Sequence, residues 1–205
     1  MANKSCIVIG GGGHARVVMD ALLLLGFEIQ GFTDIIPKQI SLHGKKITYL
    51  GTDETYLEGP SKKDIQLVNG IGSVGNPENR RGIFKRFKQA GYSFLTVIHP
   101  SAVVARDVTF GEGVQVMAGA IIQTGCKTGN NVIINTRASV DHDCVIGDHV
   151  HIAPGAVLSG NVTVDENTHI GTGASIVQGI RIPAETLVKA GSTISHSYSV
   201  ERMVQ

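Results

Sequence analysis

Ile98-His-Pro-Ser-Ala-Val is followed by Val104-Ala-Arg-Asp-Val-Thr, Phe110-Gly-Glu-Gly-Val-Gln and Val116-Met-Ala-Gly-Ala-Ile, and this six-residue pattern runs on to Thr193. The frame covers 96 residues, or 16 hexads, without an insertion. The first position is large and apolar except at Thr128, and the fifth is Ala, Val, Cys, Thr, Ser or Ile. Gly, Asn and Asp supply turn residues between these positions. The repeat predicts a parallel β-helix in which each hexad forms one short strand and one turn.

Residues 1–95 follow a different pattern, in which strand and helix signals alternate. Strands are predicted at Cys6–Ile9, Glu28–Phe32 and Ile65–Asn69, and helices after Gly13 as far as Gly26 and over Glu78–Ala90. Such alternation favours a small parallel sheet flanked by helices. The sequence therefore predicts a Rossmann-like α/β domain at 1–95, an all-β domain of hexapeptide repeats at 96–193 and a C-terminal tail at 194–205.

Composition narrows the function classes. The 205 residues contain 26 Gly and no Trp, and 18 basic residues against 17 acidic residues give a net charge of +1. Because the net charge is so small, the molecule as a whole has no positive electrostatic field to attract nucleic acid, and we expect no nucleic-acid binding. The apolar run Ala21–Leu25 is too short to span a bilayer, and no signal peptide is visible. Three Cys without paired spacing favour neither a disulfide framework nor a zinc site. A cytoplasmic protein without membrane insertion is the expectation.

The order of motifs is specific. The turn Ile9-Gly-Gly-Gly-Gly-His14-Ala, the segment Gly31-Phe-Thr-Asp34, an Arg-bearing helix and Ile98-His-Pro-Ser-Ala precede the hexads. This order resembles the bacterial sugar acetyltransferases of the NeuD/PglD type. The resemblance implies a left-handed β-helix with three hexads per coil, acetyl-CoA as the co-substrate, and homotrimers whose sites lie between subunits. Residues 18 apart would then lie on adjacent coils, which makes Cys126 and Cys144 core residues.

His142 is the candidate general base. It occupies an outward-facing third position between Asp141 and Asp143, and a carboxylate can hold an imidazole in one tautomer and raise its basicity. From the residues alone, a solvated surface histidine on a β-helix corner is the favoured interpretation. The resemblance favours catalysis and implies that Asp143, rather than Asp141, orients the ring.

Further site residues follow from the resemblance. It implies an active-site role for Asn135, a place for His151 near acetyl-CoA, and an amide donor at Gly160 for the thioester oxygen as it gains charge. His169 is 18 residues after His151, so the two rings are expected on neighbouring coils. No carboxylate or Cys shares that spacing, so no metal is expected. His149 is predicted to be an exposed corner residue.

The glycine-rich turn is the candidate substrate site. Glycines between a strand and a helix N-terminus, here Gly10, Gly11, Gly12 and Gly13, let backbone N–H groups approach phosphate. About 95 residues are few for an NAD-binding domain, so a nucleotide-sugar fits better than a dinucleotide.

Asp34 is a candidate for binding uracil or ribose, and the resemblance places His14 near the sugar phosphate. The basic residues of the second predicted helix, at 80, 81, 85, 86 and 88, are interpreted as a solvated face.

The leading hypothesis is direct transfer of acetyl from acetyl-CoA to the amino group of a UDP-linked amino-sugar in bacterial surface glycan biosynthesis. O-acetylation of sialic acid or another nonulosonic acid is an alternative within enzymes. A non-catalytic β-helix that assembles or senses nucleotide-sugars is an alternative of another class. Binding of NADH would favour an oxidoreductase.

Overall fold

A computed structural model describes residues 5–58, 65–74 and 77–196 of the chain. Its N-terminal part is a four-stranded parallel sheet in the order β2-β1-β5-β6. These strands are β1 (Ser5–Ile9), β2 (Glu28–Thr33), β5 (Gln66–Asn69) and β6 (Ser93–Phe94). The helices α1 (Gly13–Leu24) and α3 (Glu78–Gln89) lie within about two residues of their predicted bounds. The predicted α/β pattern is therefore confirmed.

Four elements of this part were not predicted, namely β6, both strands of a hairpin and a short helix. An antiparallel hairpin of β3 (Ile40–Leu42) and β4 (Lys45–Ile47) follows the second strand, and the four-residue helix α2 (Glu54–Leu57) comes next. Each strand of the hairpin has three residues, too few to show a hydrophobic period.

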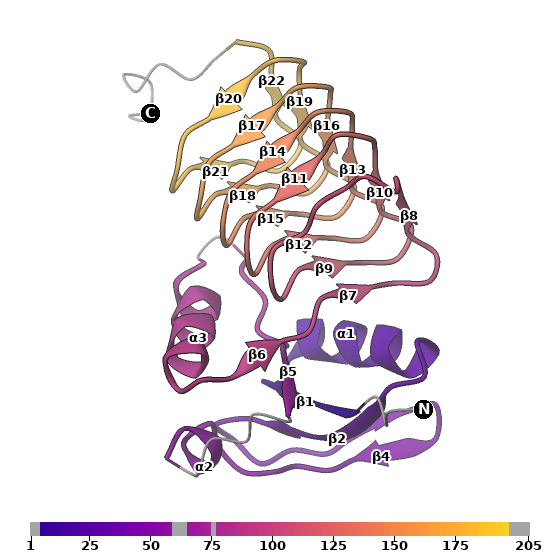
Figure 1. Cartoon of the computed structure of the whole chain (residues 1–205), viewed down its shortest axis with the longest axis vertical. Coiled ribbons are helices and arrows are strands. Elements are labelled where there is room, and N and C mark those ends of the chain that lie inside the picture. Colours follow the sequence, from indigo (N-terminus) through magenta and orange to yellow (C-terminus); the bar gives the residue numbers. More distant parts are fainter. Residues whose placement is uncertain (1–4, 59–64, 75–76, 197–205) are drawn as a thin grey trace.

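The predicted parallel β-helix forms a solenoid of about five turns, stacked on the N-terminal part (Figure 1). The first of its three sheets contains β7 (Val97–Ile98), β9 (Gln115–Val116), β12 (Ile133–Ile134), β15 (His151–Ile152), β18 (His169–Ile170) and β21 (Leu187–Val188). The second contains β8 (Val103–Val104), β10 (Ile121–Ile122), β13 (Ser139–Val140), β16 (Val157–Leu158), β19 (Ser175–Ile176) and β22 (Thr193–Ile194). The third contains β11 (Lys127–Thr128), β14 (Val145–Ile146), β17 (Thr163–Val164) and β20 (Arg181–Ile182). Paired residues are 18 apart throughout, as in Ile121 with Ser139.

The hexad positions explain the interior and the turns. First and fifth positions form one buried core, which includes the free cysteines Cys126 and Cys144. Every sixth residue from Gly113 to Gly191 has a positive φ. Half of these fourth-position residues are Gly, and the other half are Asn, Asp, His, Arg or Glu. The left-handed turn conformation itself therefore tolerates side chains.

The N-terminal part is joined to the coils by α1 and α3. The apolar residues of α1 share a core with Val97 and Met117 beside the first sheet. The other helix lies along a corner of the coils, where the Phe84 ring meets His149 edge-on at 5.5 Å between centroids.

Two predictions about this junction are wrong. Arg80 is not part of a solvated helix face, because it is only 1% exposed and donates hydrogen bonds to the carbonyl oxygens of Asn69, Ile71 and Asn131. His149 has the expected corner conformation, with φ of 61°, but it is 8% exposed because α3 covers it. Burial lowers its pKa to about 4.

Candidate functional site

His142 and Asp143 form a dyad at the corner between β13 and β14. The Nδ1 of His142 lies 2.9 Å from Oδ2 of Asp143, and their side chains are 46% and 65% exposed. A carboxylate only accepts hydrogen bonds, so Nδ1 carries the proton and Nε2 of the neutral ring has a free lone pair. The hydrogen bond that the Asp143 carboxylate accepts from the ring raises the pKa of His142, and the charges of Asp141 and Asp143 add to the effect. The dyad is chemically suited to general-base catalysis.

Glycines lie on the two coils next to the dyad. A Cβ at Gly160 would lie 2.5 Å from Cε1 of His142, so the imidazole covers this glycine directly. A Cβ at Gly125 would lie 3.3 Å from Cγ of Asp143 and closer still to its Oδ1. Within the described residues, the amide N–H of Gly160 makes no hydrogen bond. It is therefore available as a donor beside the base.

Asn135 and His151 belong to a second group. The Asn135 Oδ1 accepts the Thr136 N–H at 2.8 Å, which leaves its Nδ2 to donate to His151 Nε2 at 3.0 Å. The other ring nitrogen, Nδ1, then donates to Ser73 Oγ at 3.0 Å. Burial, helped by the neighbouring His169, lowers the pKa of His151 to about 3. The His151 ring is therefore buried and neutral, and both of its nitrogens form hydrogen bonds within the chain.

The predicted proximity of His151 and His169 is present, with ring centroids 4.7 Å apart in an edge-to-face arrangement. Across the described ranges, no group of three or more His, Cys, Asp or Glu side chains could hold a metal ion. None of the helices in those ranges is long and apolar enough to cross a membrane.

His14 bridges the two parts of the chain. Its Nε2 donates to Gln115 Oε1 at 2.7 Å, and Gln115 Nε2 donates to the carbonyl oxygen of Asn69 at 2.7 Å. Burial and the nearby Arg80 cation lower the pKa of His14 to about 4. The ring is therefore neutral, and its Nδ1 carries the lone pair.

The glycine-rich turn has the geometry of an anion site. Gly11 N–H donates to Asp34 Oδ2 at 2.8 Å, and a Cβ there would collide with Phe32 and Asp34. Gly12 and Gly13 have nothing within 4 Å of an added Cβ, so the N-terminus of α1 is open. The first helical amides and the helix dipole favour an anion at this place.

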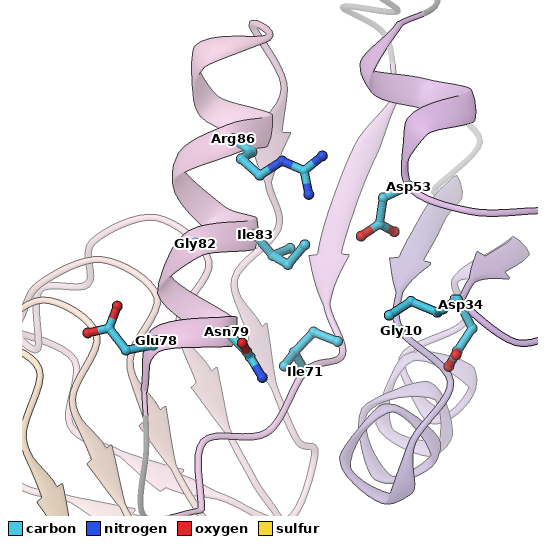
Figure 2. Close-up of a pocket in the computed structure, with 10 residues that line it drawn as sticks. Gly10, Asp34, Asp53, Ile71, Glu78, Asn79, Gly82, Ile83 and Arg86 are labelled. Atoms are coloured by element: carbon cyan, nitrogen blue, oxygen red, sulfur yellow. The ribbon is translucent and has the colours of Figure 1, made fainter.

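A pocket of about 380 Å³ opens beside this turn (Figure 2). Gly10, Asp34 and Asp53 line one side, and the facing side of α3 contributes Asn79 and Arg86. Asp53 and Asn79 were not predicted as site residues, and Arg86, which was predicted to lie on a solvated face, is half exposed and also lines the pocket. Only the basic character of the helix could have indicated Arg86, since no motif marks which residues face the sheet.

Within one chain the predicted site residues therefore form three groups. The first group is at the glycine-rich turn, where Gly10 and Asp34 line the pocket and Gly11–Gly13 lie beside it. The second group, at the junction, is His14, Asn135 and His151. The third group, at the β13–β14 corner, is His142, Asp143 and Gly160. Figure 1 shows that this corner faces away from the N-terminal sheet.

Comparison with known proteins gives two family matches. Residues 5–87 match the PglD N-terminal domain, and residues 125–160 match the bacterial transferase hexapeptide of six repeats. The curated UDP-N-acetylbacillosamine N-acetyltransferase of Bacillus subtilis (strain 168) is 37% identical over 115 residues, which are 56% of this chain and 52% of that protein. That match thus spans about half the length of the relative.

Solved structures match over almost the whole chain. The acetyltransferase domain of PglB from Neisseria gonorrhoeae FA1090 is 36% identical with a TM-score of 0.86, covering 96% of this chain and 94% of that one. It has also been solved with acetyl coenzyme A. PerB from Caulobacter crescentus, solved with CoA and GDP-perosamine, is 35% identical with a TM-score of 0.84, covering 94% and 89%.

Hexads wound into a β-helix, with a His–Asp pair on one corner, are the features of a hexapeptide-repeat acyltransferase, and the coils match the left-handed helices of that class. The N-terminal domain matches that of PglD. The chain belongs to the NeuD/PglD-type family of bacterial sugar acetyltransferases.

Proposed function

We propose that this enzyme transfers acetyl from acetyl-CoA to the amino group of a UDP-linked amino-sugar used in bacterial surface glycans. The observation that carries the proposal is the His142–Asp143 dyad, whose Nε2 is free and lies over Gly160. The relatives support an amino acceptor, because one is a UDP-N-acetylbacillosamine N-acetyltransferase and another is a perosamine N-acetyltransferase solved with GDP-perosamine. The three free cysteines fit the reducing cytoplasm in which we place the enzyme.

The geometry supports a single-displacement mechanism. The sugar nitrogen attacks the thioester carbonyl, and His142 Nε2 takes a proton from that nitrogen as the N–C bond forms. The amide N–H of Gly160 donates to the carbonyl oxygen while it carries negative charge. The C–S bond then breaks, and the proton moves from the imidazolium to the departing CoA thiolate. Asp143 keeps the ring in the Nδ1–H tautomer and stabilises the imidazolium. The buried Cys126 and Cys144 have raised pKa values, which argues against a thiolate nucleophile.

The N-terminal pocket supports a nucleotide-linked acceptor. We place the diphosphate at the open N-terminus of α1, beside Gly12 and Gly13, where backbone amides and the helix dipole face an anion. The base and ribose then occupy the pocket between Asp34 and α3, with Arg86 as a cation at its wall. Asp34 already accepts from Gly11 and pairs with Lys38 at 2.8 Å, so its first task is to shape the glycine turn.

We further propose a homotrimer whose sites are shared between subunits. The dyad and the pocket lie in different regions of one chain, so a single subunit does not present base and sugar to each other. The outer side of the second sheet carries exposed Val103, Ile121 and Val157 next to the dyad corner. A neighbouring subunit on this side would cover that apolar surface and bring its own pocket to the base.

The test is a CoA-release assay with acetyl-CoA and a panel of acceptors. UDP-linked amino-sugars should react, and His142→Asn should lower kcat by about 10²–10⁴-fold because the base is lost. His43→Asn is a matched control, because His43 forms the exposed His–Asp pair with Asp20 on the hairpin. It should leave kcat unchanged. Turnover of GDP-amino-sugars alone would overturn the choice of uridine. Turnover of free sialic acid alone would overturn N-acetylation, and an active His142→Asn would overturn the assigned base.

A further inference from the structure

The dyad lies between two glycines, at positions where the backbone conformation does not by itself require glycine. Gly125 precedes Asp143 by one coil, and Gly160 follows His142 by one coil. The corresponding strands pair with a spacing of 18 residues, so each glycine lies directly beside one member of the dyad.

Gly125 occupies a fourth hexad position with φ of +74°. Asn131, Arg137 and Asp143 adopt φ of 57° to 60° at equivalent turns, so left-handed backbone alone does not select glycine at this position. What distinguishes position 125 is its neighbour, since the space of its missing Cβ is filled by the Asp143 carboxylate.

Gly160 occupies a third hexad position, and its φ lies outside the left-handed region. It is the only glycine at a third position in the 16 hexads, where the other residues include Pro, Thr, Glu and Gln. Here too the space is filled by the dyad, because the His142 ring lies where a side chain would project.

We propose that Gly125 and Gly160 are positioning residues that together form a seat for the His142–Asp143 dyad. Gly125 lets the carboxylate lie back against the preceding coil with Oδ2 directed at Nδ1 of His142. Gly160 lets the ring lie flat on the following coil beside an available amide N–H. This glycine seat rests on the proposed role of His142 as the base, and it adds a steric role for Gly160 to its role as an amide donor.

A methyl group at either position would act on the dyad more than on the fold. The nearest atoms are the far ends of the Asp143 and His142 side chains, which are 65% and 46% exposed and can swing into solvent. Gly125→Ala should therefore break the 2.9 Å contact between Nδ1 and Oδ2 while the coils remain folded. Gly160→Ala keeps the amide N–H, so any loss it causes comes from displacement of the ring.

Gly179→Ala is the matched control for Gly125→Ala. Gly179 is also a fourth-position glycine at this corner, with φ of +73°, and nothing lies within 4 Å of its added Cβ. Both substitutions impose the same backbone strain, and only one of them meets the dyad.

The experiment combines steady-state kinetics, thermal unfolding and NMR titration of the His142 ring. We expect Gly125→Ala and Gly160→Ala each to lower kcat by about a hundredfold with the KM for acetyl-CoA little changed, because a small misplacement of a catalytic group has this effect. In Gly125→Ala the pKa of His142 should fall toward the ordinary value, as in Asp143→Asn. Gly179→Ala should match Gly125→Ala in melting temperature but retain the parent kcat and pKa.

Several results would overturn the glycine seat. They are a parent-like kcat and His142 pKa in Gly125→Ala, an equal loss in Gly179→Ala, a parent-like kcat in Gly160→Ala, or failure of Gly125→Ala to fold where Gly179→Ala folds. The titration does not depend on turnover. If His142→Asn stays active, the assigned base is wrong, and the pKa of His142 in Gly125→Ala still reports whether the seat holds the pair.

Discussion

At the scale of the residue, the Asp143 carboxylate sets the pH at which His142 can act. The hydrogen bond that Asp143 accepts from Nδ1 raises the pKa of His142, so the ring stays protonated to a higher pH than an ordinary histidine. A base must be neutral, so kcat/KM should rise with pH through this raised pKa. Asp143→Asn should move that rise to lower pH and reduce the plateau by about 10²-fold or more, since the amide no longer fixes the tautomer. Rates from about pH 5 to about pH 9 measure both effects.

Asp141→Asn is the control for charge alone. Asp141 accepts the backbone N–H of His142 at 2.8 Å and does not contact the ring nitrogens. Its loss should shift the pH profile slightly in the same direction and leave the plateau near that of the parent. Equal plateau losses in the two variants would contradict the orienting role of Asp143.

At the scale of the element, Arg80 fixes α3 to both the sheet and the coils. Its guanidinium donates to three carbonyl oxygens, at the end of β5, in the following turn and at the Asn131 corner. Arg80→Met would remove the donors to the carbonyl oxygens of Ile71 and Asn131, whereas that of Asn69 would keep its hydrogen bond from Gln115. We expect the free energy of unfolding in urea to fall by about 1–3 kcal/mol.

The adjacent Arg81→Met is the control for this prediction. Arg81 pairs with Glu78 and, at 4.0 Å, with Glu185, whose side chains are exposed. Its loss should cost about 0–1 kcal/mol, as is usual for surface ion pairs. If the two substitutions were equally costly, Arg80 would have no special role in attaching the helix.

The coils and α3 differ in how far the sequence could predict their structure. The hexads are a local pattern, so the β-helix could be predicted from their spacing. The resemblance added three hexads per coil, and from this followed the pairing of residues 18 apart and the place of Gly160 beside His142. The burial of Arg80 and His149 could not, because it depends on how α3 packs against coils that are distant in sequence. For the same reason, no motif could predict the hydrogen bond between His151 and Ser73, which are 78 residues apart in the sequence.

At the scale of the whole molecule, the separation of dyad and pocket predicts complementation between subunits. Gly12 is the N-cap of α1, with extended backbone and free space around it. Gly12→Asp should preserve the helix, since Asp is a favoured N-cap, and should repel a diphosphate by its charge. Alone, Gly12→Asp and His142→Asn should each be nearly inactive.

Co-expression of these two variants should restore activity if base and pocket come from different subunits. A site is intact when its base comes from a Gly12→Asp chain and its pocket from a His142→Asn chain, which random mixing into trimers produces at about a quarter of the sites. Light scattering should give about three times the chain mass of 21.7 kDa. Trimers without restored activity would mean that each chain contains a complete site. A monomeric mass would rule out the shared site, because no second subunit would then bring its pocket to the dyad.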